Sequence, residues 1–461
     1  MPTFSTTEPI IEVSVTHSDP LFVVDTTPYG RADIDCAVEA LCRHPALAAP
    51  RGRRLAVCLR DSFQWLALCL YLKAEGGSVL PIHPGTPLEA ARALARETGC
   101  DFLLHGDDAT LEPLPSEAEQ QIIEPAPGGE LIQLSSGTTG RPKTITRAWT
   151  TIDRELDSYV AGFVEADGLT PIVACPVTHS YGLICGFLAG LRRGVVPRVV
   201  TNLNPRFILG TLRDHPEHLL YAAPTLVSLL VRMLPSGQGF HTVMLSGAAL
   251  PAPLLETLNA RAQRVCQQYG CSEVGCIAIA PRAESPGLMG RPLAHLSVTA
   301  GRAGKSPEEI RVAVEGGRTI ATRDLGYLDK QGQLHFLARL DDTINVAGIN
   351  VYPGDVEDAF LRHPQVVEAV AFKRPDPYAG ERVCLQFVAR EPLDTEALRR
   401  WSRERLSPHQ VPMVLEQVEY IDRLPNGKVS RHRLAQAHAG AEVAANAETA
   451  AESSQVREAT P

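Results

Sequence analysis

The chain has 461 residues, a net charge of −9 and a pI of about 5.9. This length exceeds one ordinary hydrophobic core, so we expect two or three domains. The acidic balance argues against a nucleic-acid partner, which would need a basic surface. No stretch reaches the roughly 18 uninterrupted apolar residues of a membrane span. Hydrophobic residues make up 44% and charged residues 21%, which is typical of a globular protein.

The N-terminal residues indicate no signal peptide, because the first 20 contain neither Lys nor Arg and no long apolar run. The cysteines number 11, an odd count, and form no CxxC pair. Reduced thiols are the expected state, which favours a cytoplasmic location.

The first three quarters of the chain alternate between short apolar runs and helical patterns. Residues 55–59 predict a strand, the apolar-periodic stretch through Tyr71 predicts a helix, and residues 78–82 predict the next strand. Such alternation favours an α/β fold with a largely parallel, helix-covered sheet. Further buried strands are predicted to begin near Asp101, Pro171, His218 and His241.

A break near residue 339 precedes a compact segment that predicts a small α+β domain. Its helices are expected at residues 353–362 and 395–406, and its strands at residues 366–374 and 382–390. From residue 435 the chain is rich in Ala and Glu and predicts a disordered tail. We therefore expect domains at residues 1–339 and 340–434, followed by the tail at 435–461.

One loop carries the residue types of a phosphate-binding site. The stretch "QLSSGTTGRPKTITRAW" begins at Gln133 and packs hydroxyls, two glycines and a lysine into a short segment. It is not a Walker A loop, since counting from Gly137 places Pro142 where the second glycine should stand.

Several other motifs follow this loop in a fixed order. They are "HSYGL" from His179, "LSGAALP" from Leu245, "QQYGCSEVG" from Gln267, "TRDLGYLD" from Thr322, "LARLDDTINVAGINVYPGDVE" from Leu337 and "LPNGKVSR" from Leu424. From residue 54 to residue 434 the chain resembles the adenylate-forming superfamily of acyl- and aryl-CoA ligases, stand-alone adenylation enzymes and luciferases. The anchors are "SSGTTGRPK", "YGCSE", "DLG", "RLDD" and "NGK".

The resemblance implies both a fold and a reaction. The fold is a large N-terminal domain of helix-covered sheets with a small mobile α+β C-terminal lid. The reaction joins a carboxylic acid to ATP, releases pyrophosphate, and passes the acyl group of the acyl-adenylate to a thiol.

The resemblance assigns the phosphate loop to the β- and γ-phosphates of ATP. Glycines let backbone N–H groups approach phosphate oxygens closely, hydroxyls donate hydrogen bonds, and the lysine adds positive charge. The residues so implied are Ser135, Ser136, Gly137, Thr138, Thr139, Gly140 and Lys143.

The "YGCSE" motif is implied to bind the adenine, the α-phosphate and a metal ion. Tyr269, followed by Gly270, would lie against the adenine, and Ser272 would contact the α-phosphate where the family usually has Thr. Glu273 would help to hold Mg²⁺, a hard cation that needs oxygen ligands.

The next two motifs are implied to bind the ribose and to form a hinge. Asp324 would accept hydrogen bonds from the ribose hydroxyls, and Arg339 would reach the ribose or a phosphate. This chain has Arg323 where the family commonly has Gly, and Ala338 where Gly usually precedes the arginine. Asp341 matches the position about which the lid turns.

Two further groups are implied to act on the acid. Lys428, entering from the lid, would stabilise charge that develops in the adenylation transition state. His179 would lie beside the substrate carboxylate. The small residues Ser246, Gly247 and Ala248 would line the acyl and adenine pockets, which favours a flat aryl acid.

The thiol acceptor is expected to be a separate molecule, either CoA or a free acyl carrier protein, because no carrier motif follows the lid. Gly348 would lie where the pantetheine arm approaches, and Asn345 replaces a frequent lysine in that motif. The short N-terminal domain resembles in size the ligases that load hydroxybenzoates onto carrier proteins in aryl polyene and xanthomonadin pathways. We therefore predict a hydroxybenzoate–carrier ligase. An aryl- or acyl-CoA ligase, a luciferase-like oxidase and an inactive nucleotide-binding regulator remain alternatives.

Overall fold

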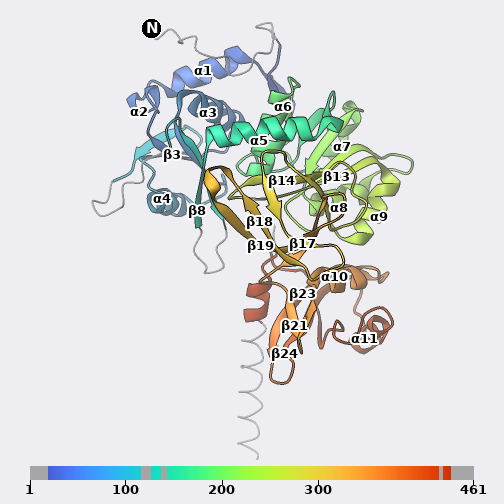
Figure 1. Cartoon of the computed structure of the whole chain (residues 1–461). Helices are drawn as coiled ribbons and strands as arrows, with labels where there is room; N and C mark the ends of the chain where they lie inside the picture. The colour runs from blue at the N-terminus through green and yellow to red at the C-terminus, as the bar shows by residue number, and fades with distance from the viewer. Residues whose placement is uncertain (1–18, 116–125, 136–142, 425–428, 438–461) are drawn as a thin grey trace, which may run out of the picture.

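The computed structural model describes residues 19–115, 126–135, 143–424 and 429–437. In this part of the chain, strands form a six-stranded sheet, a fourteen-stranded sheet and a five-stranded sheet. Figure 1 shows the first two sheets and their helices in the large body, with the third sheet in the smaller body below it. The mixed α/β architecture with a small C-terminal unit agrees with the sequence prediction.

The six-stranded sheet carries the two ends of the phosphate loop. Its strand order is β6-β5-β3-β4-β7-β8, in which β3, β4, β5 and β7 run parallel while the edge strands β6 and β8 run antiparallel to their neighbours. The strands are β3 (Arg54–Cys58), β4 (Ser78–Pro81), β5 (Phe102–His105), β6 (Thr110–Pro113), β7 (Glu130–Ser135) and β8 (Lys143–Ala148).

The fourteen-stranded sheet is mainly parallel in one half and mainly antiparallel in the other, the exceptions being the antiparallel pair β1–β2 and the parallel pair β17–β19. Strands β1, β10, β9, β11, β12 and β13 follow each other in parallel, and antiparallel pairing begins between β13 and β14. The sequence analysis did not predict the antiparallel half. The strands are β1 (Phe22–Val24), β2 (Thr27–Tyr29), β9 (Thr170–Val173), β10 (Arg198–Val199), β11 (His218–Ala222), β12 (Phe240–Leu245), β13 (Ala262–Cys271), β14 (Gly275–Ala280), β15 (Leu288–Pro292), β16 (Ser297–Thr299), β17 (Gly301–Arg302), β18 (Glu308–Ala313), β19 (Thr319–Leu328) and β20 (Leu334–Arg339).

Helices fill the space between the two sheets and cover their outer faces. The largest core cluster contains buried residues of both sheets together with α3, α5 and the π-helix η2, so these three helices lie between the sheets. Helix α4 packs on the other face of the small sheet, and α7, α8 and α9 pack on the other face of the large one. The helices of this body are α1 (Arg31–Leu41), α2 (Pro45–Ala48), α3 (Ser62–Glu75), α4 (Leu88–Glu97), α5 (Trp149–Gly162), η1 (Val164–Ala166), η2 (Tyr181–Leu188), α6 (Ala189–Arg192), α7 (Pro205–Asp214), α8 (Pro224–Met233), α9 (Ala252–Arg261) and η3 (Glu315–Gly317).

Helix α3 shows how the local sequence sets an element between the layers. Asp61 caps its N-terminus by accepting hydrogen bonds from the N–H groups of Phe63 and Gln64, and Gly76 ends it with φ of +73°. Apolar residues occupy most of its circumference, and six of them are buried. A helix that is apolar on nearly all sides needs cover on all sides, which the two sheets provide.

The C-terminal unit has its own sheet and its own apolar core. Strand order is β22-β21-β24-β23, with β25 parallel to β24, and α10 and α11 pack against this sheet. The elements are β21 (Ile344–Val346), β22 (Ile349–Val351), α10 (Pro353–Leu361), β23 (Val366–Asp376), β24 (Gly380–Ala389), α11 (Thr395–Arg403) and β25 (Val414–Gln417). The exact domain boundary at residue 339/340 remains a prediction, and so does the tail, most of which lies outside the described residues.

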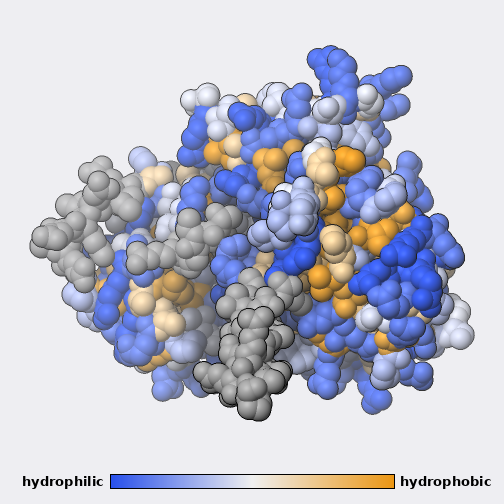
Figure 2. All heavy atoms as spheres, turned by 90° about the horizontal axis from the view of Figure 1, so that it is seen from below, coloured by the Kyte–Doolittle hydropathy of each residue, from blue (hydrophilic) through white to orange (hydrophobic). Residues whose placement is uncertain are grey.

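The surface that carries the C-terminal unit is mainly hydrophilic, with smaller hydrophobic patches between the polar side chains (Figure 2). Among the described residues, no helix combines the length and apolar character needed to cross a membrane.

Candidate active site

The phosphate loop leaves and re-enters the small sheet at one pair of residues. Ser135 ends β7 and Lys143 begins β8, and the two are cross-strand partners. The Lys143 side chain is exposed, and its Nζ lies 3.9 Å from Oε1 of Glu273. The phosphate loop and the "YGCSE" motif therefore meet in space. The loop residues Ser136, Gly137, Thr138, Thr139 and Gly140 lie outside the described residues.

A tight turn between β13 and β14 presents Glu273. Strand β13 ends at Cys271 and β14 begins at Gly275, so Ser272 and Glu273 lie in the turn between antiparallel partners. A Cβ at Gly270 would lie only 2.2 Å from the carbonyl oxygen of Gly275, so this approach of the two strands requires glycine. The Glu273 side chain is 29% exposed and open to a ligand.

Tyr269, Asp324 and Arg339 form one polar cluster. The Tyr269 hydroxyl donates a hydrogen bond of 2.7 Å to Oδ2 of Asp324, and Nε of Arg339 lies 3.5 Å from Oδ1 of the same carboxylate. Asp324 and Arg339 are cross-strand partners on β19 and β20. Burial and the neighbouring Asp324 charge raise the pKa of Tyr269, which keeps the phenol protonated as a donor. Three motifs far apart in the sequence therefore converge here.

His179 precedes the π-helix η2, which the sequence analysis did not predict. His179 is exposed, and its carbonyl oxygen accepts from the N–H of Leu183 at 2.9 Å. A Cβ at Gly182 would lie 2.4 Å from the carbonyl oxygen of Pro176, so the first turn of η2 packs directly on the preceding loop. The hydroxyl of Tyr181 donates to the carbonyl of Met244 at 2.6 Å, which ties η2 to β12. The glycine in "HSYGL" was the available signal for this close approach.

The predicted pocket residues follow directly after β12. The Ser246 hydroxyl donates to the carbonyl oxygen of Gln268 at 3.2 Å, which joins the segment after β12 to β13. Gly247 has φ of +87°, and both Gly247 and Ala248 are exposed. The roles of these small residues in binding an acid remain predictions.

Asp341, the predicted hinge residue, is paired with Arg323. Arg323 has φ of +61°, a left-handed conformation that favours glycine. Its guanidinium contacts Asp341 through two nitrogens, with Nε 3.1 Å from Oδ2. The backbone thus keeps a glycine-like geometry while the side chain forms a pair with the hinge residue.

Gly348 lies in the turn that joins β21 and β22. Ala347 and Gly348 both have positive φ, of +50° and +86°, as a two-residue type I′ hairpin turn requires. The N–H of Gly348 donates to Oδ1 of Asn345 at 3.0 Å. Asn345 therefore stabilises its own turn, which a lysine there would not do. Lys428 lies outside the described residues, so its predicted role is untested.

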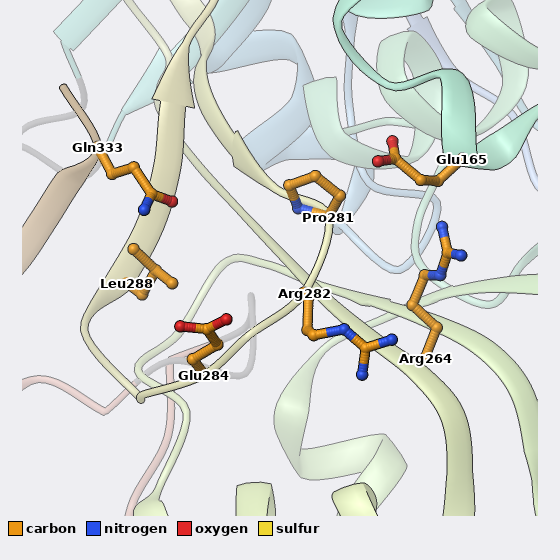
Figure 3. Close-up of a pocket in the computed structure, with 7 residues that line it drawn as sticks. All are labelled: Glu165, Arg264, Pro281, Arg282, Glu284, Leu288 and Gln333. Carbon is orange, nitrogen blue, oxygen red and sulfur yellow. The ribbon is translucent and has the colours of Figure 1, made fainter. Parts of the chain in front are cut away.

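Two hollows flank these sites without coinciding with them. One, of about 400 Å³, lies between core and C-terminal unit and is lined by Leu325, Leu340 and Asn345 among others. The other, of about 250 Å³, lies at the opposite end of β13 from Tyr269, beside Arg264 and Glu165 (Figure 3). Neither contains the Tyr269–Asp324–Arg339 cluster. The active-site assignment rests on side-chain convergence rather than on cavity size.

The sequence matches two family models. Residues 46–300 match the AMP-binding enzyme family, and residues 355–428 match the AMP-binding enzyme C-terminal domain. A 3,4-dihydroxybenzoate–[aryl-carrier protein] ligase of Bacillus anthracis is 38% identical over 414 residues, which cover 90% of this chain and 98% of that protein. A 2-succinylbenzoate–CoA ligase of Bacillus velezensis is 28% identical over 339 residues, covering 66% of this chain and 68% of that protein.

Solved structures share the fold. ATP-bound MatB from Rhodopseudomonas palustris has a TM-score of 0.77 at 19% identity, covering 92% of this chain and 97% of that one. O-succinylbenzoate coenzyme A synthetase from Bacillus subtilis, in complex with ATP and magnesium ion, has a TM-score of 0.75 at 21% identity, covering 91% and 97%. The solved structures share the fold, and the family-model match and the 38%-identical relative show that the chain belongs to the AMP-binding enzyme family, the ATP-dependent adenylate-forming ligases.

Proposed function

We propose that this enzyme activates a hydroxylated benzoic acid as its acyl-adenylate and transfers the acyl group to the phosphopantetheine thiol of a separate acyl carrier protein. The similarity to a 3,4-dihydroxybenzoate–carrier ligase over nearly the whole chain supports this choice of acid and acceptor. The small side chains after β12 also suit a flat ring.

The observation that carries the proposal is that the phosphate loop meets the turn at residues 272–274, which carries Glu273. We name it the metal-binding turn after its proposed role. Nζ of Lys143 and Oε1 of Glu273 lie 3.9 Å apart as an ion pair, so a cation suited to the triphosphate and a carboxylate suited to a metal ion stand side by side. The Lys143 ammonium attracts the pyrophosphate portion, which carries the charge of the leaving group.

The Tyr269–Asp324–Arg339 cluster would bind the nucleoside. A carboxylate has lone pairs for two ribose hydroxyls in addition to the hydrogen bond from Tyr269. Because the Tyr269 phenol donates to Asp324, it fixes the orientation of the carboxylate before the nucleotide binds. Arg339, whose side chain is 52% exposed, remains accessible to the ribose or to a phosphate.

The residues present fit a magnesium ion. Mg²⁺ is usually bound by one or two carboxylates together with phosphate oxygens and water, and Glu273 is a partly exposed carboxylate beside the phosphate loop. A bound Mg²⁺ would neutralise charge on the departing pyrophosphate.

Two steps follow. In the first, the substrate carboxylate oxygen bonds to the α-phosphorus while the bond to the pyrophosphate oxygen breaks, and Lys428 from the lid stabilises the transition state. In the second, the lid turns about Asp341 and the Gly348 turn admits the pantetheine arm. The thiol, having lost its proton, then attacks the acyl carbonyl and AMP leaves.

Carboxylate-dependent exchange of labelled pyrophosphate into ATP tests the first step. We expect exchange with mono- and dihydroxybenzoates, weaker exchange with benzoate, and little with medium-chain fatty acids. Glu273→Gln should lower the exchange rate by about 10²-fold, the scale of losing one electrostatic contributor to the transition state. Strong exchange with fatty acids and none with benzoates would contradict the choice of acid, and formation of ADP would contradict the chemistry.

The acceptor is tested by offering CoA and a phosphopantetheinylated aryl carrier protein in parallel. We expect acylation of the carrier at carrier concentrations where CoA gives little product. The 28%-identical 2-succinylbenzoate–CoA ligase makes CoA the alternative, and faster acylation of CoA would select it. All 11 cysteines are unpaired, which supports a cytoplasmic location.

A further inference from the structure

A buried ion pair lies directly behind the metal-binding turn. Arg147 on β8 pairs with Glu155 on α5, and the two side chains are 3% and 1% exposed. Charged side chains are almost never this buried unless they are paired and serve a specific geometry. Arg147 lies four residues after the "SSGTTGRPK" motif, and Glu155 lies outside all the motifs named above.

Glu155 also holds the strand that follows the turn. Its Oε1 accepts the backbone N–H of Cys276, the second residue of β14, at 2.7 Å. Gly275 has φ of +94°, and a Cβ there would lie 2.3 Å from Oε2 of Glu155 and 2.6 Å from Nη1 of Arg147. The carboxylate therefore occupies the space that any other side chain at position 275 would need.

The pair connects the two segments that carry the phosphate-binding groups. Strand β8 begins with Lys143 and contains Arg147, while the turn bearing Glu273 leads into Gly275 and Cys276. The same two segments meet again at the site, where Lys143 lies 3.9 Å from Glu273. The buried pair thus fixes β8 and β14 together a short distance behind the point where their functional side chains converge.

We infer that Arg147 and Glu155 are positioning residues that set the place of Glu273, and hence of the metal–triphosphate complex, relative to the phosphate loop. This inference deepens the proposed function and rests on it for the role of Glu273. The ligand concerned is a divalent cation bound to a nucleoside triphosphate. The pair acts through backbone contacts rather than by touching the reacting atoms.

The test compares two double variants that both remove the buried charges. Arg147→Met/Glu155→Leu removes the acceptor for the Cys276 N–H, whereas Arg147→Met/Glu155→Gln keeps a carbonyl oxygen there. Outer partners of metal ligands typically change metal affinity by about 10- to 100-fold, so we expect the first variant to raise the Mg²⁺ and ATP concentrations for half-maximal exchange by that factor. The second variant should restore most of the loss, and the half-saturating acid concentration should change little in either.

A matched control pair lies in the same sheet. Arg54 and Glu130 form a buried pair, 4% and 6% exposed, on β3 and β7, and the hydrogen bonds of their side chains reach no residue of the turn. Arg54→Met/Glu130→Leu should change thermal stability without changing the Mg²⁺ or ATP dependence. Equal shifts in both control and test variants would reduce the Arg147–Glu155 pair to a purely structural role.

Two readouts do not depend on turnover. Hydrogen exchange at the Cys276 amide should accelerate in Arg147→Met/Glu155→Leu but not in the Arg54–Glu130 control, and binding of Mn²⁺–ATP measured by electron paramagnetic resonance should weaken. Gly275→Ala should give the same signature by displacing the Glu155 carboxylate. Unchanged hydrogen exchange at the Cys276 amide and unchanged Mn²⁺–ATP binding would overturn the inference. Absence of adenylation in the wild-type protein would instead contradict the proposed function. The comparison of hydrogen exchange between the variants would still hold.

Discussion

The core and the C-terminal lid hold their charged groups in different ways. In the core, Arg147 and Glu155 are 3% and 1% exposed. In the lid, Arg431 pairs with Asp342 and Glu357 while 24% exposed, and at the hinge Arg323 and Asp341 are 55% and 36% exposed. Exposed pairs contribute little to stability, whereas breaking a buried pair is costly. The Arg147–Glu155 pair is therefore closed to water, whereas the Arg323–Asp341 pair at the predicted hinge is open to it.

The contacts between the two units described next are also made by polar groups. The N–H of Ala252, at the start of α9, donates to Oδ1 of Asp358 on α10 at 2.9 Å. Arg362 pairs with Glu256 at 2.9 Å, and both side chains are at least half exposed. Polar contacts of this kind are compatible with the lid motion proposed above.

The largest effect is expected at the lysine that the lid contributes. Lys428→Ala should slow adenylate formation by about 10³-fold, the upper range for loss of one preorganised charge at a transition state. Thioester formation from supplied acyl-adenylate should continue, because Lys428 is needed in the first lid position alone. Single-turnover measurement of each half-reaction checks this, with Lys373→Ala as the lid control. Equal loss in both half-reactions would contradict the proposal that the lid takes a different position for each of the two steps.

Tyr269→Phe tests the Tyr269–Asp324–Arg339 cluster in the core. Removing the phenol takes one hydrogen-bond donor away from the buried Asp324 carboxylate, which costs about 1–3 kcal/mol and should raise the half-saturating ATP concentration by about 10-fold. Tyr327→Phe is the matched control, because Tyr327 lies on β19, the strand that carries Asp324, and stacks on His335. Unchanged ATP dependence would show that Asp324 needs no orientation by Tyr269.

Asp358→Asn tests the contact between core and lid. Burial raises the pKa of Asp358 to about 6, so its ionised form is disfavoured in this arrangement. The penalty is present above pH 6 and disappears as the pH falls toward the ordinary value near 4. The variant should therefore be more stable than wild type by about 1 kcal/mol at pH 7.5, with the difference shrinking toward pH 4. Urea unfolding at several pH values measures this, and a difference that grows at low pH would contradict it.

The smallest effect is expected at Arg323. Arg323→Gly relieves the left-handed backbone but loses an exposed ion pair, so its stability should stay within about 1 kcal/mol of wild type. Arg323→Ala loses the pair and keeps the strained backbone, and should be less stable than the glycine variant by about 1 kcal/mol. Denaturant midpoints compare the two. If both variants were equally stable, the backbone strain would be negligible.

Local patterns predicted much of the architecture. The parallel strands β3, β4, β9, β11 and β12 lie where short apolar runs placed them, β23 covers its predicted range, and β24 overlaps its range up to residue 389. Such runs are readable because burial of one segment depends mainly on its own composition. The family motifs predict that Tyr269, Asp324 and Arg339 bind one nucleotide, and the structure brings their side chains into contact, while the binding itself stays a prediction.

The missed features depend on partners far away in the chain. Arg147 and Glu155 are residue types that usually lie on the surface, because a charged side chain is compatible with burial only when it is paired. Arg323 was noted as a departure from glycine, but its pairing with Asp341 depends on how β19 meets the chain beyond β20. Periodicity within a single segment carries no information about such pairings, so the sequence analysis could not find them.

The wide helix η2 has a consequence for how the core between the two sheets responds to a change in chain length. A π-helix contains one more residue per hydrogen-bonded turn than an α-helix. Deleting one residue within Tyr181–Leu188 would therefore rotate the following side chains by about 100° about the helix axis, while the strands on either side could stay in place. Because residues 182–188 are all buried in the core, such a deletion would present a different set of side chains to that core, so we expect this segment to tolerate no change of length.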